Sequence, residues 1–325
     1  MRILLLPLEL AWRGINRIRR ALYRRGILNA KRLPRPVISI GNISAGGSGK
    51  TPTVIHVARF LSSRGWRVAI LSRGYRRSGT DRFAIVDSDD AARFGDEPVL
   101  IRRHAAGSDV IVGADRHEAA LWYLTQHDCD LFLLDDGFQH LQLQRDVDIV
   151  IDDPGARHLR EGRSALADAD ISLVRGDPPA NIPGHYYLLQ IEATSLVLGG
   201  EHHGLGMFVG KRVLAFAGLA NNDRFFKTIE SLGGHLVGHE SFRDHAQYDE
   251  ELLDWLKKTK EEMSADLLVT TEKDWVKSPS LDIGVLIVEA VVTPLAQFHD
   301  ELIGMIEDAC KRAGRIPPEF ERTHG

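Results

Sequence analysis

The segment from residue 37 to 51 constrains this chain more than any other, because it joins a strand pattern, a glycine-rich loop and a helix start. The apolar run Val37–Ile40 predicts a buried strand, and the loop after it contains Gly46, Gly47 and Gly49. Glycines let backbone N–H groups turn inward around phosphate oxygens, and the start of a helix adds the positive end of a dipole. The pattern is typical of a phosphate-binding loop.

The end of this loop supplies the side chains that a nucleotide site needs. Lys50 is expected to reach the β- and γ-phosphates, and the Thr51 hydroxyl to bind Mg²⁺. The strict pattern asks for glycine at position 44, where this chain has Ser44. The alternative is a plain glycine-rich loop, and a Lys-Thr pair after three glycines argues against it. The candidate ATP-binding residues are Ser44, Ala45, Gly46, Gly47, Ser48, Gly49, Lys50 and Thr51.

Two carboxylates follow another predicted strand. Asp135 and Asp136 come directly after the apolar run Leu131–Leu134. A nucleotide-bound Mg²⁺ needs an acid at the end of a strand beside the phosphate-binding loop, and either side chain fits that role. Two adjacent acids also allow one to hold metal and the other a neighbouring base. The alternative is a pair of solvated turn acids.

Apolar runs alternate with helical patterns along the chain, which predicts an α/β fold. The runs are Val37–Ile40, Arg67–Ser72, Asp109–Val112, Leu131–Leu134, Val147–Ile151 and Ile171–Val174. Continuous apolar strands separated by helices are typical of a mostly parallel sheet with helices on both faces, here of the P-loop NTPase type. Prolines and glycines between about 175 and 210 predict a boundary.

We expect three parts. Residues 1–35 form a basic front end, residues 36–205 a P-loop domain and residues 206–325 a smaller α/β domain. The smaller domain is predicted to contain strands at Arg212–Ala217, Leu267–Thr270 and Val285–Val288, a helix from about 223, and a terminal helix near 295–313.

The net charge of −4 hides an uneven distribution. Residues 1–35 carry ten basic side chains and one acidic, whereas residues 36–325 carry 31 basic and 44 acidic. The acidic body argues against a nucleic-acid partner. In the front end, apolar and basic residues each recur every three or four positions, on opposite faces of one predicted helix. The apolar face consists of Leu4, Leu8, Ala11, Ile15, Ile18 and Leu22, and the basic face of Arg13, Arg17, Arg20 and Arg24.

A basic amphipathic helix of this kind suits an anionic lipid surface. The alternative is a surface helix that packs its apolar face on the protein body. The first apolar run, Ile3–Leu8, is shorter than the ~20 residues that a membrane span needs, and most charges follow it, unlike those of a signal peptide. Two cysteines, Cys129 and Cys310, rule out a disulfide framework, so the cytosol is expected.

The motifs favour a kinase over a GTPase. No Asn-Lys-x-Asp guanine-reading string occurs, and Thr271–Asp274 is the nearest to it. A kinase for an alcohol needs a base beside the acceptor hydroxyl. The candidates are Asp96 and His245, with a helix N-cap before Pro98 and a solvated loop histidine as the respective alternatives.

Several strings together resemble the tetraacyldisaccharide 4′-kinases of lipid A biosynthesis. In order along the chain they are Pro36–Thr53, Ile70–Tyr75, Gly95–Pro98, Leu134–His140, Leu159–Glu161, Phe216–Leu219, Phe242–His245 and Thr270–Asp274. Ser44 resembles the family's own variant of the phosphate-binding loop. The chain departs from the family pattern at Gly162, where a proline is usual, and at Leu141, where a basic residue is usual.

The resemblance implies an ATP- and Mg²⁺-dependent enzyme that phosphorylates the 4′-hydroxyl of tetraacyldisaccharide 1-phosphate. It implies a monomeric, peripheral protein on the cytosolic face of the inner membrane, with its active site between two domains joined by a two-stranded linker. It further implies catalytic roles for Lys50, Asp96, His245, Asp136 and Arg160, with Asp96 as the base supported by His245. Thr51, Asp135 and Asp136 are implied as metal-side residues, and Arg73, Arg13, Arg17, Arg20 and Arg24 as lipid contacts.

Two other functions stay open at this point. The phosphate-binding loop alone allows a membrane-associated ATPase with a regulatory role, and it allows a P-loop kinase for a soluble small molecule. ATP hydrolysis without lipid phosphorylation would favour the first of these.

Overall fold

The computed structural model describes residues 14–44, 46–156, 158–179, 182–244, 246–277 and 282–316. Up to residue 175 the strands are β1 (Val37–Asn42), β2 (Val68–Ser72), β3 (Phe83–Ile85), β4 (Asp109–Gly113), β5 (Leu131–Asp135), β6 (Val147–Asp152) and β7 (Ile171–Arg175). The helices are α2 (Lys50–Ser63), α3 (Ala91–Phe94), α4 (Asp96–His104), α5 (Arg116–Leu124) and the 3-10 helix η1 (Arg163–Asp168). All six strands predicted in this part are present, and β3 is an addition.

The larger half of the molecule is built on a parallel sheet. Its strands lie in the order β7-β6-β1-β5-β2-β4, with β3 antiparallel at the edge. Ile40 near the end of β1 is paired with Asp135 at the end of β5. Because parallel strands end at the same edge of a sheet, the glycine-rich loop after β1 and the acids after β5 start side by side.

Helices cover both faces of this sheet. Val54, Val57 and Leu61 of α2 pack in one core with Ile38. Residues of α5 pack in a separate core on the opposite face, with Phe132. Neighbouring positions on β1 and β5 alternate between these two cores because successive strand residues point to opposite faces. The predicted α/β class, a mostly parallel sheet with helices on both faces, is confirmed.

The smaller half follows residue 185. Its strands are β8 (Tyr186–Leu198), β9 (Glu201–His203), β10 (Arg212–Ala217), β11 (His235–Ser241), β12 (Leu267–Thr271) and β13 (Gly284–Thr293). Its helices are η2 (Leu205–Phe208), α6 (Asn222–Ser231), α7 (Glu250–Glu262) and α8 (Glu272–Trp275). β11, β10, β12 and β13 pair in parallel, and α6 and α7 belong to two different cores against them.

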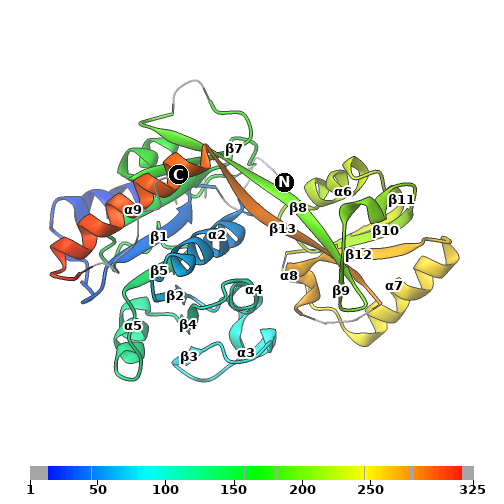
Figure 1. Ribbon diagram of the computed structural model, residues 1–325, viewed down its shortest axis with the longest axis horizontal. Coiled ribbons are helices and arrows are strands. Elements are labelled where there is room, and N and C mark those ends of the chain that lie inside the picture. Colours follow the sequence, from blue (N-terminus) through cyan, green and yellow to red (C-terminus); the bar gives the residue numbers. More distant parts are fainter. Residues whose placement is uncertain are drawn as a thin grey trace.

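Two long strands join the halves. β8 pairs in parallel with β7 and antiparallel with β13 over most of its length. Figure 1 shows both strands running from the larger half into the smaller one. The region predicted as a boundary thus contains β8, a single strand that belongs to both units. One continuous sheet extends from β11 to β3.

The terminal helix α9 (Leu295–Arg312) packs where the sequence analysis did not expect it. Its Phe298, Leu302 and Ile306 are buried in the same core as Ile38 of β1. The chain returns along β13 to the larger half before α9 begins (Figure 1). The expected division at residue 206 therefore does not hold for this helix.

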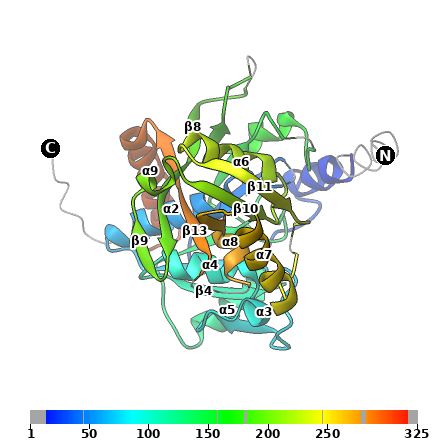
Figure 2. The ribbon, with the colours of Figure 1, turned by 90° about the vertical axis from the view of Figure 1, so that its right-hand side faces the viewer.

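The front end contributes a helix at residues 14–24. In Figure 2, where the smaller half faces the viewer, this helix and α9 lie on opposite sides of the molecule. Its Ile15 and Ile18 side chains are exposed, which contradicts the alternative that they pack on the protein body. Within the described ranges, no helix combines the length and hydropathy that crossing a membrane requires.

Candidate active site

The glycine-rich loop uses the backbone conformations that glycine allows. Gly46 and Gly49 have φ values of 105° and 95°. A Cβ on Gly46 would lie 2.8 Å from the Cβ of Ala220, and one on Gly49 would lie 2.8 Å from Cδ1 of Ile191. Both positions therefore require glycine, for conformation and for space. The loop therefore lies close to Ala220 of the smaller half and to Ile191 of β8.

Hydrogen bonds fix the polar parts of the loop. Asn42 at the end of β1 donates its side-chain N–H to Oγ of Ser48 over 2.6 Å. Arg175 at the end of β7 donates to the carbonyl of Gly47, also over 2.6 Å. Helix α2 begins at Lys50, so the positive end of its dipole adjoins the loop. Ala45, also predicted to bind ATP, lies outside the described residues.

Two cations meet one carboxylate beside the loop. Nη1 of Arg160 lies 2.9 Å from both carboxylate oxygens of Asp136. Nζ of Lys50 lies 3.5 Å from Oδ1 of the same residue. Asp136 has a positive φ of 52°, which is uncommon for a residue with a side chain, and such strain is concentrated at functional sites. Three residues predicted as catalytic thus form one contact group.

Backbone hydrogen bonds bring Arg160 to this place from a distant part of the chain. The N–H groups of Arg160 and Glu161 both donate to the carbonyl of Ile43. Leu159 forms an isolated antiparallel bridge with Ser44. Residues 159–161 therefore lie along the segment that enters the glycine-rich loop, although more than a hundred residues separate the two in sequence.

The two adjacent aspartates differ in ionisation. Burial, Glu97 and Asp136 raise the pKa of Asp135 to about 7. Burial also favours the neutral form of Asp136, but Lys50 and Arg160 outweigh it and lower the pKa of that residue to about 2. Oδ2 of Asp135 accepts a hydrogen bond from Ser72 over 2.9 Å, whereas its buried Oδ1 has no partner among the described residues.

The smaller half brings a lysine to the same region. Nζ of Lys273 lies 3.1 Å from Oε1 of Glu97 and 3.2 Å from Oδ1 of Asp244. Burial lowers the pKa of Lys273, but the charges of Glu97, Asp244 and Asp96 outweigh it and raise the pKa above its ordinary value. Asp96 is buried at the first position of α4, with Gly95 as the N-cap, so the alternative role of Asp96 as N-cap is wrong. His245 lies outside the described residues.

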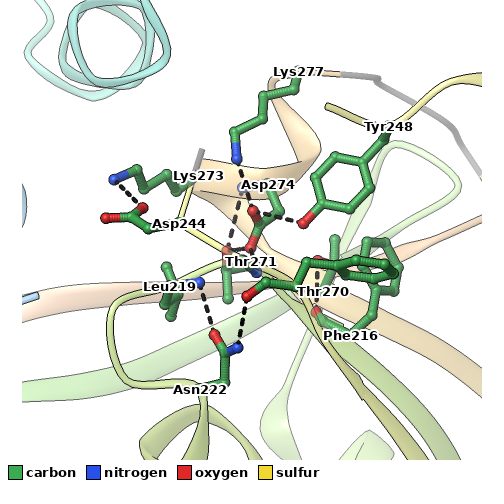
Figure 3. A network of polar contacts seen from close by, with 12 residues as sticks. Phe216, Leu219, Asn222, Asp244, Tyr248, Thr270, Thr271, Lys273, Asp274 and Lys277 are labelled. Carbon is green, nitrogen blue, oxygen red and sulfur yellow. Dashed lines mark hydrogen bonds and ion pairs between the residues drawn. The ribbon is translucent and has the colours of Figure 1, made fainter. Parts of the chain in front are cut away.

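A buried carboxylate holds this part of the smaller half together (Figure 3). Asp274 accepts hydrogen bonds from the backbone N–H of Gly218 and the hydroxyls of Tyr248 and Thr271. Nζ of Lys277 lies 2.9 Å from Oδ1 of the same carboxylate. These contacts link the ends of β10 and β12 to the segment before α7, and they fix the short helix that carries Lys273.

Further cations lie beside the carboxylates. Arg116 at the start of α5 is 8% exposed, and its Nε has no hydrogen-bond partner among the described residues. Burial and Arg73 lower the pKa of Arg116, while Asp136 and Asp135 act in the opposite direction. Burial and Arg116 lower the pKa of His140 to about 3. The sequence analysis missed Arg116, although its place just after β4 puts it at the same sheet edge as the acids.

The helix at residues 14–24 does not present all its arginines outward. Arg17 and Arg24 are exposed, and Nη2 of Arg24 lies 2.7 Å from Oδ2 of Asp168. Arg20 is only 6% exposed and pairs with Glu161, so its predicted place on an outward basic face is wrong. The physical reason is that a buried carboxylate faces the helix at this position. Arg13 lies outside the described residues.

A phosphate-binding loop, its lysine, and paired acids on the neighbouring strand of a parallel sheet define a nucleotide site of the P-loop NTPase type. The pattern of the family described as "Tetraacyldisaccharide-1-P 4'-kinase" matches residues 1–307. The chain belongs to this family, as its motifs indicated, and it is therefore an enzyme of lipid A biosynthesis that phosphorylates an alcohol.

Relatives in other bacteria support the assignment. The tetraacyldisaccharide 4′-kinase of Pelobacter propionicus is 38% identical over 297 residues, which cover 84% of this chain and 82% of the relative. That of Shewanella sp. strain MR-4 is 35% identical and covers 94% of this chain and 92% of the relative. The crystal structure of Aquifex aeolicus LpxK in complex with ATP superposes with a TM-score of 0.74 at 28% identity, over 94% of this chain and 99% of that chain.

Proposed function

We propose that this chain transfers the γ-phosphoryl group of ATP to the 4′-hydroxyl of tetraacyldisaccharide 1-phosphate, with the residues described above in defined roles. The observation that carries the proposal is the contact group of Lys50, Asp136 and Arg160 beside a phosphate-binding loop. Phosphoryl transfer depends mainly on positioning and on cations around the moving group, and this site supplies both.

ATP and Mg²⁺ fit the residues present. Gly46 and Gly49 form a cradle that side chains would fill, which leaves the backbone free to approach phosphates. The unpartnered buried oxygen of Asp135 is a hard carboxylate donor of the kind that Mg²⁺ prefers. We assign the metal ion to Thr51, Asp135 and Asp136; when bound, it neutralises charge on the phosphates.

Asp96 is the proposed base, with His245 as its support. A buried carboxylate at the first position of α4 can accept the proton of the 4′-hydroxyl if that hydroxyl reaches it. Lys273 keeps positive charge beside this carboxylate and beside Glu97.

Lys50 and Arg160 are the cations assigned to the transferring phosphoryl group. In the structure both are held by Asp136. A carboxylate between two cations keeps their side chains ordered before a phosphate arrives, which reduces the entropy lost on binding. Arg160 is suited to this role because its planar guanidinium can donate two bonds to one phosphate.

The lipid is expected to meet the enzyme at the cytosolic face of the inner membrane. Ile15 and Ile18 are exposed on the helix at residues 14–24, next to exposed Arg17. Apolar and basic side chains together suit an anionic lipid surface. Arg73 is exposed and offers donors for the anionic head of the substrate. The enzyme is expected to act as a monomer.

The deciding experiment is phosphoryl transfer from γ-³²P-labelled ATP to tetraacyldisaccharide 1-phosphate in detergent micelles. We expect Lys50→Ala and Asp96→Asn each to lower kcat at least ~100-fold, because each removes a group that acts on the transferring phosphoryl group or the acceptor. Lys258→Ala, which changes an exposed lysine of α7, serves as the matched control and should keep full activity.

No transfer by well-folded enzyme would refute the proposed reaction. Near-normal turnover by either variant would refute the role given to that residue. Hydrolysis of ATP without lipid phosphorylation would instead point to the regulatory ATPase.

A further inference from the structure

One face of the helix at residues 14–24 is fastened to the segment that carries Arg160. The side-chain N–H of Asn16 donates to the carbonyl of Arg160 over 3.4 Å. Arg20, one turn later, pairs with Glu161, and Arg24, a further turn on, lies 2.7 Å from Asp168. Residues four apart lie on the same helix face, so these contacts share one direction. The exposed isoleucines of the same helix point elsewhere.

Arg20 is the centre of this contact. Its Nε and Nη2 donate to the two carboxylate oxygens of Glu161 over 3.1 Å and 2.9 Å. Nη2 also donates to the carbonyl of Phe138 over 3.3 Å, and the guanidinium lies 4.0 Å from the centre of the Phe138 ring. Arg20 and Glu161 are 6% and 4% exposed. A single buried guanidinium therefore binds two separate segments of the chain.

Those two segments carry the charged pair of the active site. Phe138 lies two residues after Asp136, and Glu161 directly follows Arg160. Asp136 and Arg160 contact each other through two hydrogen bonds of 2.9 Å. Arg20 thus links the backbone segment of Asp136 to that of Arg160, and the side chains of Asp136 and Arg160 contact each other.

We propose that Arg20 is a positioning residue that fixes the Asp136–Arg160 pair for phosphoryl transfer, which makes the N-terminal helix a part of the active site and not only a contact for lipid. The proposal rests on the proposed function, because it takes Arg160 to act on the transferring group. A displacement of a catalytic group by about 1 Å costs up to ~100-fold in rate. Contacts of Arg20 that hold the segments of Asp136 and Arg160 in place are therefore expected to affect kcat.

Arg20→Lys is the variant that separates positioning from simple stability. Lysine keeps the charge that a buried Glu161 needs, so the fold should be retained. It lacks the planar fork of guanidinium and cannot serve the Glu161 carboxylate and the Phe138 carbonyl in the same geometry. We expect the Tm to stay close to that of the wild type while kcat for lipid phosphorylation falls about tenfold, with little change in KM for ATP.

Two further measurements complete the test. Arg25→Gln removes an exposed arginine just beyond the end of the same helix and should leave kcat and KM unchanged. Binding of Mg²⁺–ADP–aluminium fluoride, which mimics the transferring phosphoryl group, should weaken about tenfold in Arg20→Lys, whereas binding of Mg²⁺–ADP should not. This binding assay needs no lipid substrate.

The outcomes are distinct. If the wild-type enzyme fails to phosphorylate the lipid, the proposed function falls, and the aluminium fluoride assay alone decides the role of Arg20. If Arg20→Lys keeps wild-type affinity for this mimic, or if its kcat equals that of Arg25→Gln, the positioning role is overturned. A loss of kcat that only follows a fall in Tm would assign Arg20 a merely structural role.

Discussion

Asp135 and Asp136 are neighbours in sequence, yet their surroundings move their pKa values in opposite directions. Asp135 ends a buried strand near Glu97, and its pKa rises to about 7. Asp136 turns toward Lys50 and Arg160, and its pKa falls to about 2. Asp136 is therefore the ionised partner of two cations in this structure, whereas burial and neighbouring acids favour the neutral form of Asp135.

A histidine pair between α2 and α9 is expected to make the stability of the protein depend on pH. Nε2 of His56 in α2 and Nε2 of His299 in α9 are 3.1 Å apart. Burial lowers the pKa of both, to about 4 for His299. Two imidazoles in this geometry disfavour protonation of the pair, so the folded state takes up protons less readily than the unfolded one.

We expect His299 to contribute a fall in Tm as the pH is lowered from 7 toward 4. Unfolded His299 takes up a proton near its ordinary pKa of 6.5, while the folded residue does so only near pH 4. Between these values the unfolded state holds more protons, so stability rises with pH. His299→Gln should reduce the fall in Tm between pH 7 and pH 5 in scanning calorimetry. His235→Gln, at an exposed position, should keep it; an unaltered pH dependence in His299→Gln would contradict this account.

At the scale of elements, α8 shows how a helix too short to be stable alone is held in place. It spans four residues, and isolated helices of this length do not form. Thr271 caps its first turn, and Asp274 within it binds the end of β10 and Tyr248. The place of Lys273 at the active site therefore depends on the buried carboxylate of Asp274.

We predict that Asp274→Asn lowers both stability and activity. The change removes the charge that faces Lys277 and weakens several buried hydrogen bonds, at a cost of about 3 kcal/mol in the free energy of unfolding. Urea unfolding and lipid phosphorylation measure the two effects. Asp282→Asn, an exposed carboxylate before β13, is the control and should change neither. Wild-type stability of Asp274→Asn would show that the network does not hold α8.

At the scale of the whole molecule, the two halves share one sheet and contact each other beside the active site. β8 and β13 pass between them, and Lys273 of the smaller half reaches Glu97 of the larger one. His104 in α4 also contacts Glu272 in α8. Helix α9 then packs on the larger half, in the same core as β1 and α2.

We expect Leu302→Ala in α9 to destabilise the P-loop half, although this residue lies close to the end of the described chain. Leu302 is fully buried in the core that contains α2 and β1, and a cavity there costs ~2–4 kcal/mol. Thermal loss of ATP binding, followed by a fluorescent nucleotide, should shift to lower temperature. Leu295→Ala, at a half-exposed position of the same helix, should not shift it. An equal effect of both changes would refute the packing role of α9.

The parts that could be predicted from sequence have local signals. Strands β1, β2, β4, β5, β6 and β7 are short apolar runs, and the phosphate-binding loop is one continuous string. The place of Asp135 and Asp136 beside the loop could be predicted because neighbouring parallel strands end at the same edge of a sheet. Lys273 stands in the family string Thr270–Asp274 and Arg116 follows a predicted strand, but neither position states a role. Each is one basic residue among 41 until the fold brings it near the carboxylates.

By itself, the sequence determined the α/β class, the nucleotide loop, the candidate acids and the family, because these depend on patterns within a few residues or on ordered motifs. Only the tertiary structure decided that α9 returns to the larger half, that Lys273 meets Glu97, and that Arg20 points inward to Glu161. The periodicity of a helix distinguishes its faces but does not state which face a distant segment will cover. A buried carboxylate 141 residues away turned one arginine of the basic face into an internal contact.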